Sequence, residues 1–314
     1  MSSYKDRVDP ELLPGFSPEI EAWFGMIGPD MEPVRKMGEE MLKMNQQNLP
    51  PFPGSEEVVT IPGLNGAPDV PVRCYRPETP KYPDAAMVWL HGGGYIMGAA
   101  EDPSVYRFTP LMHVFSVDYR MAPEHRSPAA AEDSCAAIEW VAANAAELGI
   151  DPRKIILGGP SGGGGLAASA ALLNRDRGGP ALLYQFLIYP MLDDTHDTPS
   201  GHMDIPAWTW NREISLRAWD MYVEEDGATP YAAAARATDL SGLPPTYIMT
   251  GDLDLFRDED IDYAKRLSAA GIPVDLAVFP GAPHGFDLFA PDAAVSKRAN
   301  AHMIEALEQT LSKT

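Results

Sequence analysis

The stretch 158-GGPSGGGGLA-167 decides how the middle of this chain folds. It follows the apolar run 154-KIIL-157 and leads into the alanine-rich run 166-LAASAALL-173, so it joins a predicted strand to a predicted helix. Glycine inside regular structure costs about 0.5–1 kcal/mol relative to alanine, so a cluster of glycines needs a reason. Three explanations are open: a phosphate-binding loop, a flexible linker, or a strained turn that exposes Ser161.

The strained turn fits best. Residues 162–167 satisfy G-x-G-x-x-A only inside the predicted helix, no clear ribose-binding acid follows the next strand, and a Walker-type loop would need a lysine. The apolar runs on both sides leave no room for a linker. Gly159-Pro160-Ser161-Gly162-Gly163 instead matches G-x-S-x-G between a strand and a helix, where small neighbours let the serine hydroxyl project from a sharp turn.

A second glycine cluster supports a hydrolytic site. The predicted strand 86-AMVWL-90 is followed by 91-HGGGY-95, a loop type whose backbone N–H groups point at a developing oxyanion. One such donor is typically worth about 10²–10³ in rate. The N–H of Gly162, next to the serine and at the positive end of a helix, is predicted to be a further donor. His91 precedes the serine, so we expect it to brace the loop rather than to react.

Chain order predicts an acid after the serine and then a histidine. Asp252 and Asp254 follow the predicted strand 246-TYIMTG-251, and both are candidates. His284 follows the last predicted strand and is the candidate base. A serine hydroxyl is a poor nucleophile until an imidazole takes its proton, and a carboxylate must orient that imidazole.

The rest of the chain predicts an α/β fold. An antiparallel pair is expected within residues 56–61 and 70–75, and then strands alternate with helices, which indicates a mostly parallel central sheet covered by helices on both faces. The further strands are predicted at 86–90, 114–119, 154–159, 183–190, 246–251 and 274–279. The helices between and after them are predicted at 129–148, 161–174, 258–270 and 292–312.

Residues 1–50 differ from this pattern and predict an N-terminal helical cap segment. One helix is expected to begin after Ser17 and another to cover about 31–45, where Met37, Met41 and Met44 recur at helical spacing. These methionines are predicted to pack on the body of the protein, and a role in lining an apolar pocket is compatible with that.

The predicted catalytic domain covers residues 51–314, with a hinge at 49–56 and a cap insertion at about 200–225. The insertion carries Trp208 and Trp210, which are candidates for lining an acyl pocket.

Composition excludes several classes of function. The 314 residues carry a net charge of −21 without a basic run, so a nucleic-acid partner is not expected. No apolar run is long enough for a membrane span, so we expect no stable membrane association. No signal peptide is evident, and the two cysteines are predicted to be free thiols. We therefore expect a cytoplasmic protein. The acidic loop 191-MLDDTHD-197 lacks metal-ligand spacing and is predicted to be a solvated structural loop.

The chain resembles the hormone-sensitive-lipase-like (bacterial family IV) esterases of the α/β-hydrolase fold. The resemblance spans about residues 55–310. The matching pieces are HGGGYIMG (91–98), VDYRMAPEH (117–125), GPSGGGGLAA (159–168), DLSGLPP (239–245), DLDLFRDE (252–259) and PHGF (283–286).

The resemblance assigns roles by motif. It implies Asp254 as the triad acid beside Ser161 and His284, and the N–H groups of Gly93 and Gly94 as oxyanion donors. Tyr95 beside them is a candidate substrate contact. Pro160 and Gly162 depart from the family's G-D-S-A-G, which puts the rigidity of the elbow and the placing of its oxyanion donor in question.

We therefore predict a serine carboxylesterase that acts on small-molecule esters with short or medium acyl chains. The resemblance implies no metal or organic cofactor, and it suggests a homodimer. Two alternatives are an amidase or acyltransferase with the same triad, and a non-catalytic ligand-binding receptor.

Overall fold

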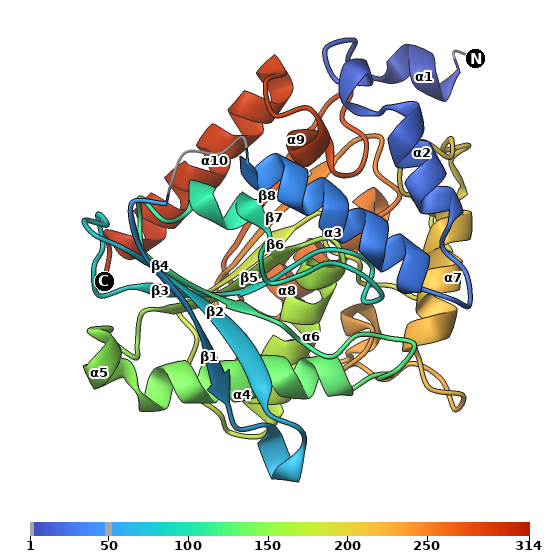
Figure 1. Ribbon diagram of the computed structural model, residues 1–314. Coiled ribbons are helices and arrows are strands. Elements are labelled where there is room, and N and C mark those ends of the chain that lie inside the picture. Colours follow the sequence, from blue (N-terminus) through green and yellow to red (C-terminus); the bar gives the residue numbers. More distant parts are fainter. Residues whose placement is uncertain (1–2, 48–51) are drawn as a thin grey trace.

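The computed structural model describes residues 3–47 and 52–314 and contains one eight-stranded sheet in the order β1-β2-β4-β3-β5-β6-β7-β8 (Figure 1). Strand β2 is antiparallel to both of its neighbours, β1 and β4, and the remaining neighbours are parallel. The strands are β1 (Gly54–Ile61), β2 (Val70–Pro77), β3 (Ala86–Leu90), β4 (His113–Val117), β5 (Ile155–Pro160), β6 (Tyr184–Ile188), β7 (Thr246–Gly251) and β8 (Val274–Phe279).

Helices cover both faces of the sheet, as the alternation of strands and helices predicts. The helices are α1 (Tyr4–Arg7), α2 (Pro18–Gly25), α3 (Glu32–Gln47), α4 (Ala129–Ala143), α5 (Ala145–Leu148), α6 (Gly162–Asp176), α7 (Arg212–Tyr222), α8 (Arg257–Ala269), α9 (Phe286–Phe289) and α10 (Ala294–Leu311). The predicted α/β class with a mostly parallel sheet is confirmed.

Strand β3 shows how the sequence divides the core into two layers. Side chains alternate between the faces of a strand. Val88 and Leu90 join one buried cluster with α4, α6 and α8, whereas Met87 and Trp89 join a second cluster with α10. Both faces of β3 are buried, which explains why 86-AMVWL-90 is apolar throughout instead of alternating.

Several predicted boundaries differ from the structure. The strand predicted at 114–119 ends at Val117, and the helix predicted at 129–148 is divided at Asn144 into α4 and α5. The predicted boundary at residue 50 and part of the predicted hinge at 49–56 lie outside the described residues. Met41 packs against the core, as predicted, but Met44 is 66% exposed.

Helices α1–α3 and α7, which belong to the segments predicted to form a cap, lie near one another toward the upper right of Figure 1, and we refer to them together as the cap. Buried apolar residues of α2 and α3 belong to the same cluster as α7. Arg217 of α7 donates to the backbone carbonyl of Ile27, between α2 and α3, at 3.2 Å. Arg35 of α3 forms an ion pair with Glu124 and donates to the Ile96 carbonyl of the body.

The structure bears on two expectations from composition. Cys74 and Cys135 are both free and buried. Among the described residues, no helix is long and apolar enough to cross a membrane.

Candidate active site

Ser161 sits at a sharp turn between β5 and α6, with φ 57° and ψ −124°. Its N–H donates to the Ile188 carbonyl of β6 at 2.8 Å, which ties the turn to the sheet. A β-carbon added to Gly159 would lie 2.3 Å from the Leu90 carbonyl oxygen, and one on Gly163 would lie 2.0 Å from it. The two glycines of G-x-S-x-G are therefore needed because the turn and β3 are in backbone contact.

Pro160 occupies the last position of β5 and is still paired with Ile188 of β6. The pairing of β5 with β3 ends at Trp89 and Gly158, two residues earlier. Pro160 has no N–H to extend the pairing with β3, whereas the next N–H, from Ser161, continues the pairing with β6.

Ser161, His284 and Asp254 converge although they are far apart in sequence. His284 Nε2 lies 2.8 Å from Ser161 Oγ, and His284 Nδ1 lies 2.8 Å from Asp254 Oδ2. Asp254 is fully buried, whereas Ser161 and His284 retain 9% and 6% exposure. Asp252 instead accepts the N–H of Gly281 at 2.7 Å, so of the two candidate acids only Asp254 contacts the imidazole.

Two aromatic rings that the sequence analysis missed hold the His284 imidazole. Tyr189 and Phe256 place their ring centroids 4.8 and 5.0 Å from it, both in edge-to-face geometry. Phe256 also donates its backbone N–H to Asp254 Oδ1 at 2.9 Å. Both residues stand just after a strand or beside a catalytic motif, but no sequence signal separates them from ordinary core aromatics.

The loop of Gly93 and Gly94 adopts a conformation that other residues rarely take, with φ of 118° and 58°. It lies against the start of α6, because a β-carbon on Gly162 would lie 2.7 Å from the Gly94 nitrogen. The three predicted donors thus occupy one small region beside Ser161. His91 is buried and stacks on Tyr119 with centroids 4.2 Å apart, as expected for a bracing residue.

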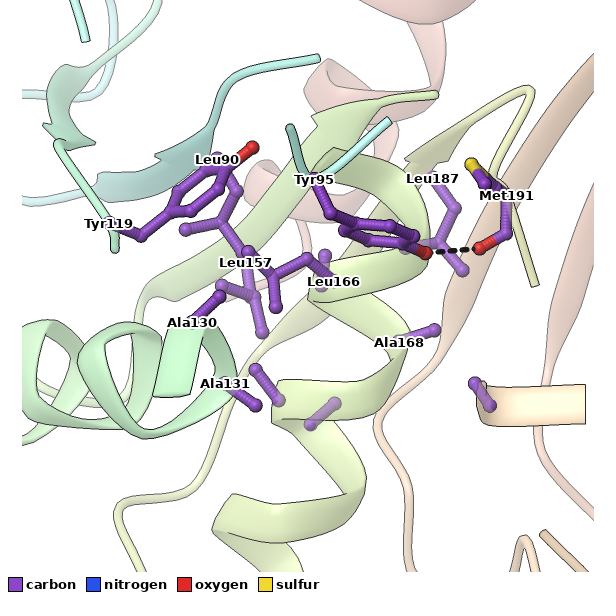
Figure 2. Close-up of a cluster of buried hydrophobic side chains, with 14 of the residues drawn as sticks. Leu90, Tyr95, Tyr119, Ala130, Ala131, Leu157, Leu166, Ala168, Leu187 and Met191 are labelled. Atoms are coloured by element: carbon purple, nitrogen blue, oxygen red, sulfur yellow. Dashed lines mark hydrogen bonds between the residues drawn. The ribbon is translucent and has the colours of Figure 1, made fainter. Parts of the chain in front are cut away.

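The side chain of Tyr95, the candidate substrate contact, does not lie with the other candidate site residues. Its side chain is fully buried, and its hydroxyl donates to the Met191 carbonyl at 2.5 Å (Figure 2). Its ring stacks on Tyr222 of α7 at 4.1 Å. The backbone of Tyr95 continues the glycine loop, but with a φ of 68° its side chain turns into the core beneath the site.

The two predicted tryptophans lie in the segment that covers the site. A β-carbon on Gly94 would lie 2.5 Å from the Trp210 ring, so Trp210 borders the glycine loop. Trp208 is half-buried and packs on Phe16, with centroids 4.9 Å apart. Between them, Thr209 donates to the His284 carbonyl at 3.4 Å, a contact that sequence reasoning missed.

A hollow of about 470 Å³ opens in the cap beside α7. Its lining includes Ile27, Pro123 and Met221 but none of Ser161, Asp254 and His284. The candidate triad is therefore identified by the geometry of its three side chains and not by this hollow.

The loop at 191–197 was predicted to be solvated, but the structure buries part of it. His196 is fully buried against Glu259 and Ser215. Burial raises the pKa of Glu259 to about 7, and the contact with His196 opposes that rise. No metal-binding group of three or more His, Cys, Asp or Glu residues occurs in the described part of the chain.

Asp260, next to this loop, is fully buried, and neither of its carboxyl oxygens has a hydrogen-bond partner among the described residues. Burial raises the pKa of Asp260 well above 3.8, the carboxylates of Glu259 and Asp254 add to the rise, and the nearby Thr250 hydroxyl opposes it. The folded protein therefore keeps a proton here that the unfolded chain releases above about pH 4.

This retained proton predicts a pH-dependent stability difference. Stability falls as pH rises wherever the folded state binds more protons than the unfolded state. Wild type should therefore lose stability relative to Asp260→Asn as the pH rises from 5 to 8. The unfolding free energy of the variant minus that of wild type should increase, by up to about a tenfold change in the folding equilibrium constant per pH unit. Urea unfolding at both pH values measures it, and a difference independent of pH would contradict the prediction.

Comparison with known proteins agrees with this architecture. A family model described as alpha/beta hydrolase fold matches residues 87–288. The carboxylesterase NlhH of Mycobacterium tuberculosis is 36% identical, covering 90% of this chain and 97% of that protein. The solved structure of a bacterial heroin esterase has a TM-score of 0.89 and 38% identity, covering 98% of both chains. An esterase of the archaeon Pyrobaculum calidifontis has a TM-score of 0.82 and 34% identity, covering 93% of this chain and 98% of that one.

Proposed function

This chain belongs to the hormone-sensitive-lipase-like family of α/β hydrolases and is a carboxylic ester hydrolase, and from that premise we propose that Ser161 is its nucleophile. His284 is the proposed base, and Asp254 orients it. The observation that carries the proposal is the pair of 2.8 Å contacts that link the three side chains through the two ring nitrogens of His284.

In the proposed reaction, Ser161 Oγ attacks the ester carbonyl carbon while His284 Nε2 takes the hydroxyl proton. The N–H groups of Gly93, Gly94 and Gly162 stabilise the oxyanion that forms. The bond to the alcohol oxygen then breaks, and His284 gives its proton to the leaving alcohol. Water, activated by His284, hydrolyses the acyl-enzyme and restores Ser161. These steps need no metal or organic cofactor.

The proposed substrates are esters with short or medium acyl chains. The cap lies directly on the site, because Trp210 borders Gly94 and Thr209 contacts the His284 backbone. Such close cover limits the length of chain that fits beside the serine. Trp208, which is half-buried against Phe16, remains a candidate for lining the acyl pocket.

A chain-length series with a covalent probe tests this function. We expect p-nitrophenyl acetate, butyrate and octanoate to be hydrolysed with a burst of one p-nitrophenol per active site, and palmitate at least about tenfold more slowly in kcat/KM. A fluorophosphonate should label the protein once, at Ser161. Absence of both labelling and turnover would overturn the proposal and favour a ligand-binding receptor.

The same assay separates the related activities. A matched p-nitroanilide that reacts faster than the ester would indicate an amidase, and an added alcohol that captures most of the acyl group would indicate an acyltransferase. We also propose a cytoplasmic location and a homodimer, and light scattering of the purified protein tests the latter.

A further inference from the structure

Ser215, His196 and Glu259 form a second arrangement of serine, histidine and carboxylate. His196 Nε2 lies 2.8 Å from Ser215 Oγ, and His196 Nδ1 lies 3.3 Å from Glu259 Oε2. When the Nδ1–H group donates a hydrogen bond to the carboxylate, Nε2 accepts a hydrogen bond from the serine hydroxyl. Ser215 and His196 are fully buried and Glu259 is 4% exposed, so a substrate cannot reach this serine as it could reach Ser161. The arrangement therefore connects elements of the fold.

The connected elements are the cap and the catalytic body. Ser215 lies in α7, and Arg212, one turn earlier in the same helix, donates to the His196 carbonyl at 2.5 Å. Glu259 lies in α8 and also accepts the backbone N–H of Leu192 at 2.8 Å. His196 is thus fixed to α7 at its carbonyl and at its ring, and to α8 at the other ring nitrogen.

The backbone of His196 is strained, with a φ of 49° in a region that residues other than glycine rarely adopt. Such conformations persist where surrounding contacts over-determine them, and they concentrate at functional sites and switch regions. A β-carbon on Gly201 would lie 2.2 Å from the His196 carbonyl oxygen, so the following turn closes tightly over this residue.

His196 is linked through neighbouring side chains both to the proposed catalytic base and to the oxyanion loop. The Phe256 ring has its centroid 5.7 Å from the His196 ring and 5.0 Å from the His284 ring. On the other side, α7 packs on the oxyanion loop, because Trp219 lies 5.1 Å from Tyr95 between ring centroids.

We propose that His196 is a positioning residue that clamps α7 onto the body and so holds the oxyanion loop and His284 in register. The inference rests on the proposed function of Ser161 and His284. It assigns a role in esterase catalysis to a buried loop histidine that touches no reacting atom.

The test uses the full chain with two clamp variants and one matched control. Ser215→Ala removes the contact between α7 and the ring. His196→Asn removes the imidazole but keeps a residue type that tolerates positive φ. Ser116→Ala is the control, because Ser116 is equally buried in β4 and its hydroxyl has no partner among the described residues.

We expect kcat for p-nitrophenyl butyrate, per site labelled by fluorophosphonate, to fall about threefold in Ser215→Ala and about tenfold in His196→Asn, with KM within about twofold. Amide hydrogen exchange in residues 212–222 should accelerate by about threefold to tenfold, and by less elsewhere. A purely structural role would lower the melting temperature and leave kcat per labelled site unchanged.

The outcomes separate the two proposals. If Ser215→Ala and His196→Asn both match Ser116→Ala in kcat and in the exchange of α7, the clamp is wrong while the esterase mechanism stands. If wild type neither hydrolyses esters nor takes the probe, the proposed mechanism is wrong, and hydrogen exchange still measures the clamp. If His196→Asn does not fold, Ser215→Ala decides the matter alone.

Discussion

Replacing Ser161 by alanine is expected to lower kcat for p-nitrophenyl butyrate by about 10⁴-fold or more. The substitution removes the proposed nucleophilic oxygen, so water would have to react without the proposed covalent intermediate. The oxyanion donors and the cap remain, so a small residual rate over the uncatalysed reaction should persist. Initial rates over a range of protein concentrations, with fluorophosphonate labelling in parallel, measure the loss.

The folded state should tolerate this change. Ser161 keeps its backbone contact with Ile188, and its strained φ of 57° is no worse for alanine than for serine. Near-UV circular dichroism and the thermal midpoint should stay close to those of wild type, with Ser116→Ala as the reference for a buried serine. A folded Ser161→Ala protein that retains more than about one hundredth of the wild-type activity would contradict the assignment of Ser161 as the nucleophile.

Replacing Gly93 by alanine should have the second largest effect. The β-carbon would lie 2.1 Å from the Met97 carbonyl oxygen, and φ is 118°, so the loop has to move away from its present conformation. Loss of one oxyanion donor lowers kcat by about 10²–10³-fold. Because the donors act on the transition state, KM should change much less than kcat. Steady-state kinetics with p-nitrophenyl butyrate measures both constants.

Gly66→Ala is the matched control. Gly66 also has a positive φ, of 82°, but a β-carbon there meets nothing within 4 Å. Gly66→Ala introduces similar backbone strain, but it has no clash and no role near Ser161. Its loss of stability therefore measures the effect of the strain alone. Equal kcat values for the two variants would contradict the assignment of the Gly93 loop to the oxyanion site.

Short-range sequence patterns determined most of the framework. The boundaries of β3, β7 and β8 were predicted from short runs of apolar and β-branched residues bounded by glycine, proline or charge. Strands β3 and β7 are buried throughout, which suits continuous apolar runs, whereas β8 lies at the edge of the sheet and is largely exposed. The elbow around Ser161 is equally local, since its glycines avoid backbone contacts that a β-carbon would make. Chain order then placed an acid and His284 at the ends of later strands.

Tertiary structure alone decided which side chains face each other. The sequence left both Asp252 and Asp254 as candidates until the motif was compared with the family. In the structure, Asp252 accepts the N–H of Gly281 at 2.7 Å, whereas Asp254 lies 2.8 Å from the His284 ring. Tyr95, beside the glycine loop, was a candidate substrate contact, but its side chain is buried in the core. The loop 191–197 was predicted to be a solvated structural loop because it lacks metal-ligand spacing, yet His196 within it is buried against Ser215 of α7 and Glu259 of α8. Periodicity and turn chemistry are properties of a few adjacent residues, whereas the direction of a side chain at a strained position depends on elements that approach from elsewhere in the chain.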